Sequence, residues 1–263
     1  MSLDHESLLE LFDQHVRRDC RCVGHQVERL DRVTRVTGPS AFPSENFIVW
    51  SDLDENNADR EIKIHQDYFQ KLGHSCEWYV YNHDQPKDLV DRLTNHGFVI
   101  DSEETLVICK SSEIKPVQSP HNVLIRKLDQ PRDIPDSLHV SDLVWGTQYH
   151  DFVTRWLTHL VKDHPEDSTV LVAYNHDQPV GTSWAIHWRG SPFASLFGGT
   201  VLPEWRGQGI YRAMVAERAT AAAATGNDWC AVDAGSESFP ILKRLGFQSL
   251  TKRTCLCWEN GRE

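Results

Sequence analysis

The sequence has no apolar run that approaches the ~20 residues a helix needs to span a bilayer, so we expect neither a transmembrane helix nor a membrane partner. Its start lacks a basic segment followed by an apolar core, which predicts no secretory leader and a cytoplasmic protein. The 263 residues carry a formal net charge of −11, and this argues against nucleic acid as a partner. With 40% hydrophobic and 25% charged residues, the composition is typical of a globular protein of one or two domains.

The seven cysteines and 14 histidines lack the spacing of redox or metal sites. Cys20 and Cys22 form one C-x-C pair and Cys255 and Cys257 another, instead of C-x-x-C. Because an odd number of cysteines cannot all pair, we expect reduced thiols. No His-Glu-x-x-His motif occurs, so the sequence predicts no metal site.

Negative charge is concentrated in the first part of the chain. Residues 1–115 contain 13 Lys and Arg against 22 Asp and Glu, a net of −9. Residues 116–263 contain 14 against 16, a net of −2. An anionic ligand therefore meets less repulsion in the second part, and the acidic first part suggests a cationic acceptor.

Residues 111–121 have two prolines and no periodicity, and we interpret them as the linker between domains 1–115 and 116–263.

Apolar periodicity predicts helices and strands in both parts. In the first part, helices are expected at 5–18, 62–72 and 86–95, and strands at 46–50, 77–81, near 99 and at 106–109. In the second part, helices are expected at 134–145, 152–162, 210–225 and 239–245, and strands at 123–127, 170–174, 180–188, 193–201, 229–234 and twice between 247 and 258. Hairpins occur beside helical crossovers. We therefore predict an α/β (α+β) fold with a mixed, mostly antiparallel central sheet flanked by helices.

Two repeats are visible. Residues 79–109 and 231–257 both predict a strand, a helix, Gly-Phe and two strands in that order, which suggests two related domains. The hexapeptide Tyr-Asn-His-Asp-Gln-Pro also occurs twice, at 81–86 and 174–179. A helix pattern follows the first copy and a strand pattern the second, so we interpret this identity as a coincidence of turn chemistry.

The segment from Phe197 to Tyr211, Phe-Gly-Gly-Thr-Val-Leu-Pro-Glu-Trp-Arg-Gly-Gln-Gly-Ile-Tyr, joins a predicted strand to a long helix. Gly207 and Gly209 leave backbone N–H groups unobstructed, and the helix N-terminus adds roughly half a positive charge. Such a turn can bind a pyrophosphate. The segment is neither a Walker loop nor a dinucleotide fingerprint, because Gly-Lys-Ser/Thr and G-x-G-x-x-G are both absent. An ordinary tight connection would look the same, so the glycines alone leave both interpretations open.

This segment resembles the acyl-CoA-binding signature of the GNAT superfamily of N-acetyltransferases, V-x-P-x-x-R-G-x-G-I. Residues 238–247, which end in Leu-Gly-Phe, resemble the second helix of that family. The resemblance covers residues 120–260 and implies a GNAT-like fold with acetyl-CoA as co-substrate. It implies that the turn binds the pyrophosphate and that the strand before it pairs with the pantetheine arm. The implied cofactor-binding residues are Gly199, Thr200, Val201, Arg206, Gly207, Gln208, Gly209, Ile210 and Tyr211.

Several positions depart from the family pattern. Tyr211 stands where members often have Gly or Ala, and Leu242 stands where many carry a tyrosine that protonates the leaving thiolate. The predicted strand at 193–201 has no carboxylate to act as a base. The remaining catalytic candidates are Asp233, at the end of a strand, and Ser238, at the start of the next helix. Either could instead be structural, Asp233 by bonding neighbouring backbone and Ser238 by capping the helix.

The corresponding loop of the first part, residues 51–61, has no glycine and contains five carboxylates, so it would repel a pyrophosphate. We therefore predict that residues 1–115 are a degenerate GNAT-like copy, with an unrelated α+β domain as the alternative. The resemblance implies an N-acetyltransferase that moves an acetyl group from acetyl-CoA to a primary amine of a small-molecule or peptide acceptor. A catalytically silent CoA-binding or regulatory module, and transfer of a different acyl group, are the alternatives. The oligomeric state stays open.

Overall fold

The computed structural model describes residues 4–261, which form two compact units. Unit 1 comprises the chain up to Val107, residues 233–239 and the chain from Ser249 onward, and unit 2 comprises residues 108–232 and 240–248. Three strands cross this division: β5 (Val99–Lys110), β10 (Trp229–Ala234) and β11 (Gln248–Trp258). The units are therefore not consecutive lengths of chain, and the domain limits of 1–115 and 116–263 stay a prediction.

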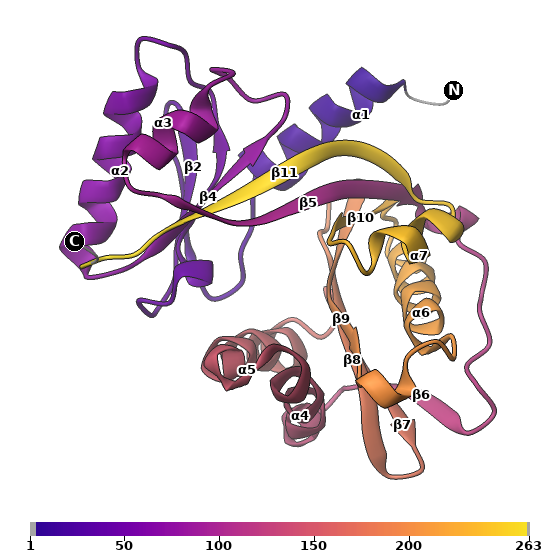
Figure 1. The fold of residues 1–263 in the computed structure, drawn as a ribbon. Coiled ribbons are helices and arrows are strands. Elements are labelled where there is room, and N and C mark those ends of the chain that lie inside the picture. Colours follow the sequence, from indigo (N-terminus) through magenta and orange to yellow (C-terminus); the bar gives the residue numbers. More distant parts are fainter. Residues whose placement is uncertain (1–3, 262–263) are drawn as a thin grey trace. The chain divides into compact units, whose positions relative to one another are not determined.

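Unit 1 begins with a helical segment, α1 (His5–Phe12) and the π-helix η1 (Asp13–Arg18). Its further elements are β1 (Gln26–Arg29), β2 (Val33–Thr37), the 3₁₀ turn η2 (Pro43–Glu45), β3 (Phe47–Ser51), α2 (Ala58–Leu72), β4 (Cys76–Tyr81) and α3 (Leu89–Asn95). Strands of this unit follow the order β1-β2-β3-β4-β11-β5 (Figure 1). β3 and β4 are parallel, whereas β1/β2, β2/β3 and β4/β11 are antiparallel.

Alternation along the strands of unit 1 separates two apolar layers. Ile48 packs with Ile62 and Phe69 of α2 and with the fully buried Trp78. Its neighbour Phe47 points to the opposite face, where it joins the smaller cluster that contains Cys20 and Val36. Successive side chains of a strand point to opposite faces, so one strand serves both layers.

Unit 2 begins with the last three residues of β5, which the 3₁₀ turn η3 (Ser111–Glu113) follows. Its other elements are β6 (Val123–Lys127), η4 (Pro131–Asp133), α4 (Ile134–Trp145), η5 (Thr147–Tyr149), α5 (His150–Thr158), the π-helix η6 (His159–Asp163), β7 (Ser168–Asn175), β8 (Gln178–His187), β9 (Phe193–Val201), η7 (Pro203–Trp205), α6 (Ile210–Ala224) and α7 (Phe239–Arg244). The strand order is β10-β9-β8-β7-β6, with β9/β10 parallel and the other pairs antiparallel. Figure 1 shows α4 and α5 on one face of these strands and α6 on the other.

The predicted fold class is confirmed: each unit has a mixed, mostly antiparallel sheet flanked by helices. The predicted strand pairs at the ends of both repeats are wrong, because β5 and β11 are single strands of 12 and 11 residues. Their middles are polar, and the sequence pattern broke there. Glu104 of β5 and Arg253 of β11 form an ion pair, so the strands continue through charged residues.

The strands β1 and β2 were not predicted from the sequence. Glu28 and Arg35 interrupt their apolar pattern, yet the two residues lie opposite each other in the ladder and form a salt bridge of 2.8 Å. Cross-strand charge pairs stabilise a hairpin in place of apolar contacts, and single-sequence periodicity does not detect them.

The internal repeat extends further in the structure than in the sequence. In each unit a 15-residue helix, α2 or α6, joins two parallel strands. A short helix follows and ends at a glycine with positive φ, Gly97 at +86° and Gly246 at +97°. The next residue is a buried phenylalanine, Phe98 or Phe247, before the long final strand. The same order of elements therefore occurs twice.

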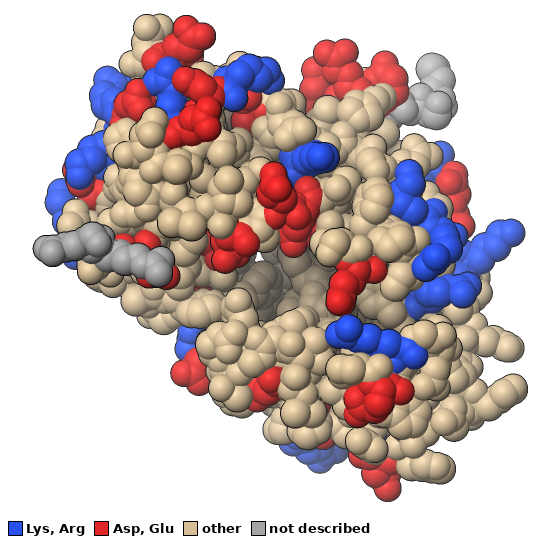
Figure 2. Space-filling view, viewed as in Figure 1, with Lys and Arg blue, Asp and Glu red and all other residues tan. Residues whose placement is uncertain are grey.

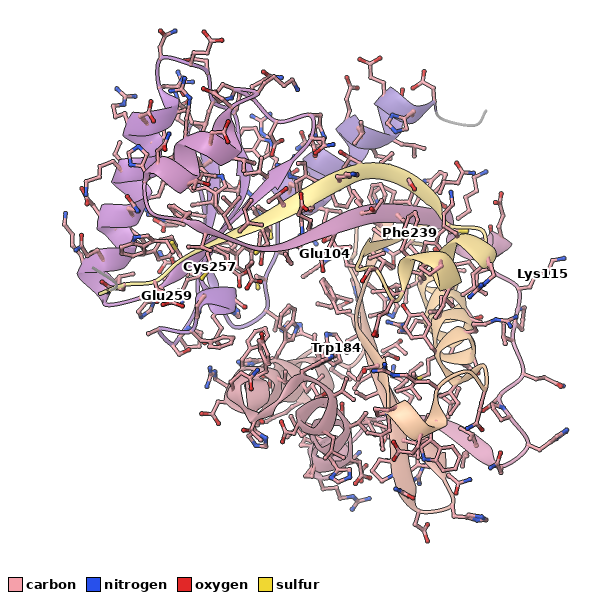
Figure 3. The ribbon with its side chains drawn as sticks, viewed as in Figure 1. Glu104, Lys115, Trp184, Phe239, Cys257 and Glu259 are labelled. Atoms are coloured by element: carbon pink, nitrogen blue, oxygen red, sulfur yellow. The ribbon has the colours of Figure 1, made fainter. Side chains whose placement is uncertain are left out.

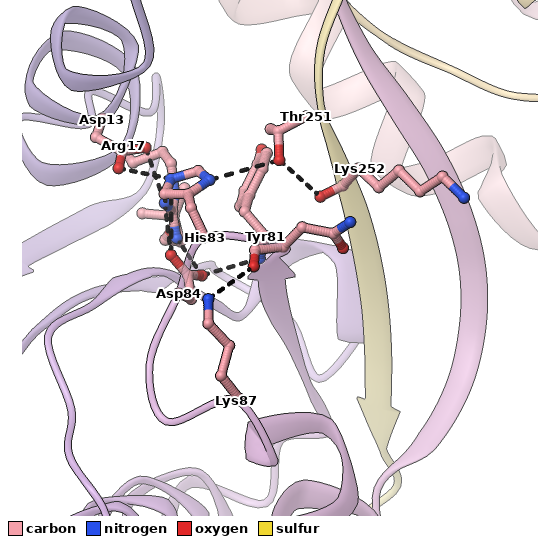
Figure 4. Close-up of polar contacts among 10 residues, drawn as sticks. Asp13, Arg17, Tyr81, His83, Asp84, Lys87, Thr251 and Lys252 are labelled. Carbon is pink, nitrogen blue, oxygen red and sulfur yellow. Dashed lines mark hydrogen bonds and ion pairs between the residues drawn. The ribbon is translucent and has the colours of Figure 1, made fainter. Parts of the chain in front are cut away.

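A buried arginine organises one face of unit 1. The Arg17 side chain has no exposed surface, donates two hydrogen bonds to the Asp84 carboxylate (2.9 and 2.7 Å) and one to Asp13 (2.8 Å), and stacks over the Tyr81 ring (Figure 4). Nε2 of His83 lies 2.8 Å from Asp13. Burial opposes ionisation of Asp13, but His83 and Arg17 outweigh it and hold the pKa of that carboxyl below its usual value.

None of the described helices is long and apolar enough to cross a membrane.

We expect Asp84→Ala to lower the free energy of unfolding by about 3–5 kcal/mol, because the buried guanidinium of Arg17 then lacks the carboxylate that accepts two of its hydrogen bonds. Asp177→Ala is the matched control. Asp177 holds the same position in the second Tyr-Asn-His-Asp-Gln-Pro copy and is exposed. Urea unfolding of the two variants measures the difference, and a loss below ~1 kcal/mol for Asp84→Ala would contradict the role of this network.

Candidate functional site

The parallel strands β9 and β10 of unit 2 pair only over a short distance. Their ladder runs from Phe193 opposite Trp229 to Ser195 opposite Ala231. β9 continues for six more residues, to Val201, and these remain paired with β8 on the other side. The edge of residues 196–201 that faces away from β8 lies beyond this ladder, so it can offer backbone groups to a ligand.

A β-bulge lies on this part of β9. Trp184 of β8 faces Phe197, and Thr182 faces Thr200, so the single residue Ser183 stands opposite Gly198 and Gly199. Gly198 has a φ of +59°, which favours glycine. A Cβ on Gly198 would also lie 2.2 Å from the Trp184 ring, whose place on β8 is shown in Figure 3. The bulge therefore needs glycine for both its backbone and its packing.

Two side chains of α6 lie against the bulge. The Tyr211 ring covers Gly199 so closely that a Cβ there would be 2.8 Å from it. Arg218, two turns further along the helix, is 2% exposed. Its Nη1 donates to the carbonyls of Trp184 and Phe197 at 3.1 Å each, and its Nε donates to Met214 at 3.1 Å. Sequence analysis missed Arg218, although it is the one arginine on the buried face of an alanine-rich helix.

The predicted glycine loop connects β9 to α6. Nε of Arg206 donates to the Val201 carbonyl at 3.1 Å and so closes the loop on the strand end. Gly207 and Gly209 have φ values of +75° and +93°, and a Cβ on either would meet nothing within 4 Å. Both glycines are therefore required by backbone conformation, and open space lies beside them.

No side chain of the described residues caps the N-terminus of α6. Its N-cap is Gly209, and the carbonyl of Gly209 accepts from the Ala213 amide at 3.0 Å. Amides of the first turn precede that bond and point out of the helix end. Together with the helix dipole, they can bind an anion.

The corresponding helix end of unit 1 is filled by its own loop. The Asp54 carboxylate accepts hydrogen bonds from the amides of Asn56 (2.7 Å) and Asn57 (3.1 Å), directly before α2. The side-chain Oδ1 of Asn57 in turn accepts a hydrogen bond from the Asp54 amide at 3.0 Å. The Asp54 carboxylate thus accepts the amides of the loop directly before α2, although no described side chain caps the helix itself.

The two candidate catalytic residues lie in residues 233–239 of unit 1. Asp233 pairs with Arg253 at 3.0 Å, and the same guanidinium pairs with Glu104 of β5, which is labelled in Figure 3. Burial opposes the charge of Arg253, but the two carboxylates hold its pKa well above the usual value. The other oxygen of Asp233, Oδ1, is buried and has no hydrogen-bond partner among the described residues. Ser238, directly before α7, donates a hydrogen bond to the Gly235 carbonyl at 3.3 Å.

Further side chains of unit 2 differ in burial and in the chemistry they can offer. The His187 ring is 2% exposed, its Nε2 lies 2.8 Å from Thr169 Oγ1, and burial lowers its pKa to about 4. The Leu242 side chain is fully buried and offers no proton. Lys243 and Arg244 of α7 are exposed, and Figure 2 shows Lys and Arg side chains gathered around that helix.

An aromatic layer covers the opposite face of the bulge strands. Trp145 of α4 packs edge-on against Trp184, with ring centroids 6.0 Å apart. The ring centroids of Trp156 of α5 and Phe197 are 5.6 Å apart. The indole N–H groups of Trp156 and Trp184 are buried without a hydrogen-bond partner among the described residues. Large rings therefore hold the strand segment that carries the bulge.

We expect Gly198→Ala to cost more stability than Gly190→Ala. Both glycines have positive φ, at +59° and +77°, so each substitution costs about 1–2 kcal/mol of backbone strain. Only the methyl group at 198 meets the Trp184 ring, which adds about 1–3 kcal/mol for overpacking. Urea unfolding measures the free energy of unfolding of both variants. Equal losses would show that the Trp184 ring moves aside without an energetic penalty.

Comparisons with known proteins bear on the family and the fold of the chain. Residues 136–247 match the model of the acetyltransferase (GNAT) family. No curated protein matches the chain in sequence. Among solved structures, a GCN5-related N-acetyltransferase from Kribbella flavida is similar over 98% of this chain and 95% of its own, with a TM-score of 0.71 and 13% identity. A functionally unknown conserved protein from Staphylococcus epidermidis is similar over 94% and 97%, with a TM-score of 0.70 and 18% identity.

A tandem GNAT protein from the clavulanic acid biosynthesis pathway is also similar, over 88% of this chain and 80% of its own, with a TM-score of 0.59 and 10% identity. Identities this low show the fold alone, but they show it for nearly the whole chain. The chain therefore has the fold of GNAT and tandem GNAT proteins over nearly its whole length, and its residues 136–247 match the model of the acetyltransferase (GNAT) family.

Proposed function

We propose that the protein is an N-acetyltransferase that moves an acetyl group from acetyl-CoA to a primary amine of a small-molecule or peptide acceptor. The observation that carries this proposal is the uncapped N-terminus of α6, where Gly207 and Gly209 face open space inside the segment that matches the GNAT family. The pyrophosphate of CoA binds there through backbone amides of Arg206–Tyr211, and the exposed Lys243 and Arg244 of the same unit favour a polyanionic ligand.

The pantetheine arm pairs with β9. Gly199, Thr200 and Val201 lie on the segment of β9 beyond its ladder with β10. An extended ligand can form strand-like hydrogen bonds along such an edge. In this arrangement the thioester end of the ligand is directed toward the bulge at Gly198 and Gly199, which lies upstream of the loop on the same strand.

CoA binds unit 2 only. In unit 1 the Asp54 carboxylate already accepts the amides before α2, and a pyrophosphate would have to displace it against like-charge repulsion. We propose that unit 1 is a copy of the fold that has lost CoA binding.

The reaction joins the amine nitrogen to the acetyl carbon, breaks the C–S bond and releases CoA as thiolate. An ordinary thiol has a pKa of ~8.5, so the thiolate leaves readily without an acid. The reaction therefore needs no acid at the position of the buried Leu242, whose side chain cannot donate a proton. The amine nitrogen must lose a proton as it attacks.

We propose Asp233 as the group that takes this proton, directly or through water. It lies on β10 two residues beyond Ala231, the last residue paired with β9. Its Oδ1 accepts no hydrogen bond from the described residues, whereas Oδ2 is held by Arg253. Ser238 is the weaker candidate, because its hydroxyl donates to its own turn.

Gly209→Glu tests the CoA site. It places a carboxylate beside the proposed pyrophosphate, where two charges 4 Å apart repel by about 4 kcal/mol at an effective dielectric of 20, so CoA should bind at least ~10²-fold more weakly. Gly226→Glu is the control, since Gly226 lies just beyond the other end of α6, also has positive φ (+82°) and faces open space. Calorimetry should give one site per chain for the wild type and the control. Unchanged affinity in folded Gly209→Glu, or two sites per chain, would contradict the assignment.

Asp233→Asn tests the base. Loss of a general base lowers kcat/KM by about 10²-fold or more, and the acidic limb of the pH–rate profile, where a base becomes protonated, should change. Glu104→Gln is the matched control, because it removes the other carboxylate of Arg253 with the same change of charge. An equal loss in both variants would show that the ion pairs are only structural. CoA binding without acetylation of any amine in a broad panel would favour a silent CoA-binding module.

A further inference from the structure

We infer that Arg218 is a positioning residue for acyl transfer: its buried guanidinium fixes the backbone of the β9 bulge and places a positive charge beside the thioester. This inference rests on the proposed function, because it concerns the strand segment to which the pantetheine arm is assigned. It adds a residue outside the glycine loop and outside the candidate bases.

Arg218 is unusual because it is a buried cation without an anionic partner. Within residues 4–261, no carboxylate pairs with it, and its hydrogen bonds go to three backbone carbonyls. Burial lowers its pKa, and Tyr211 partly offsets this effect. The other fully buried arginine, Arg17, lies in contact with both Asp84 and Asp13. An unpaired buried charge destabilises a fold, so its presence at the bulge calls for a compensating role.

The geometry specifies what Arg218 holds. One nitrogen, Nη1, binds the carbonyls of Trp184 and Phe197, the register pair directly before the bulge. In a planar trans peptide the C=O and the following N–H point in opposite directions. Anchoring the Phe197 carbonyl therefore also sets the direction of the Gly198 amide, even though glycine at φ +59° has little conformational preference of its own.

The charge of Arg218 acts on the same place. Its Nη2 atom would lie 3.4 Å from a Cβ on Gly199, so the guanidinium reaches the bulge residue itself. During acyl transfer, negative charge develops on the thioester oxygen. A fixed positive charge in a desolvated site stabilises that charge more than it stabilises the neutral ground state. Arg218 should therefore affect kcat and leave the binding of CoA unchanged, because the pyrophosphate is assigned to the loop.

The test uses acetyl-CoA labelled with ¹³C at the thioester carbonyl. Isotope-edited infrared spectra should show that binding to the wild type lowers the carbonyl stretching frequency relative to free acetyl-CoA. Arg218→Met should lose at least half of this shift, and Arg218→Lys, which keeps the charge but not the planar fork, should retain more of it. Arg132→Met makes the same change at an exposed position of unit 2 and should behave as the wild type.

Turnover with any primary amine that the wild type acetylates provides the second readout. We expect Arg218→Met to lower kcat by about 10²–10³-fold, the scale for losing one electrostatic stabiliser, with the Kd of CoA within about threefold of the wild type. A folded Arg218→Met with unchanged kcat or an unchanged infrared shift overturns the inference. If the substitutions prevent folding, the wild-type spectrum alone is the test. A carbonyl stretching frequency of bound acetyl-CoA equal to that of free acetyl-CoA would also overturn the inference. Absence of acetyl-CoA binding by the wild type would instead refute the proposed function.

Discussion

The bulge in β9 is the constraint on which the candidate site depends. One residue of β8 faces two glycines there, and this mismatch separates the segment that pairs with β10 from the segment that leads into the glycine loop. The strained backbone is held from both sides of the strand. Trp184 packs directly on Gly198, while Tyr211 and Arg218 of α6 lie against Gly199. Interiors are close-packed, so such a backbone geometry persists only when its neighbours leave no alternative.

The two units show how one arrangement of elements can gain or lose an anion site. Both place a 15-residue helix between parallel strands, and both helices therefore present amides at the same structural position. Glycines with positive φ leave that position open before α6, whereas the Asp54 carboxylate satisfies the amides before α2. The helix dipole is present in either case, and the loops before the two helices differ in that a carboxylate accepts backbone amides only before α2 among the described residues.

Buried charge is arranged differently in the two units. In unit 1, Arg17 pairs with Asp84 and Asp13, and Arg253 pairs with Asp233 and Glu104, so each guanidinium faces carboxylates. In unit 2, the hydrogen bonds of Arg218 within residues 4–261 go to carbonyl oxygens alone. Paired charges restrict the fold to one arrangement, whereas an unpaired charge produces a local field.

The sequence by itself determined the mixed fold, most helices, and the glycine loop with its GNAT resemblance, because these depend on local periodicity and on residue types at fixed spacing. It did not determine the strands whose charged residues pair with partners far along the chain, such as Glu104 with Arg253, 149 residues away. It also gave no sign of the bulge contacts of Trp184 and Arg218, or of the engagement of Asp233 by Arg253. Those features depend on which side chains the folded sheet brings together, and only the tertiary structure decided them.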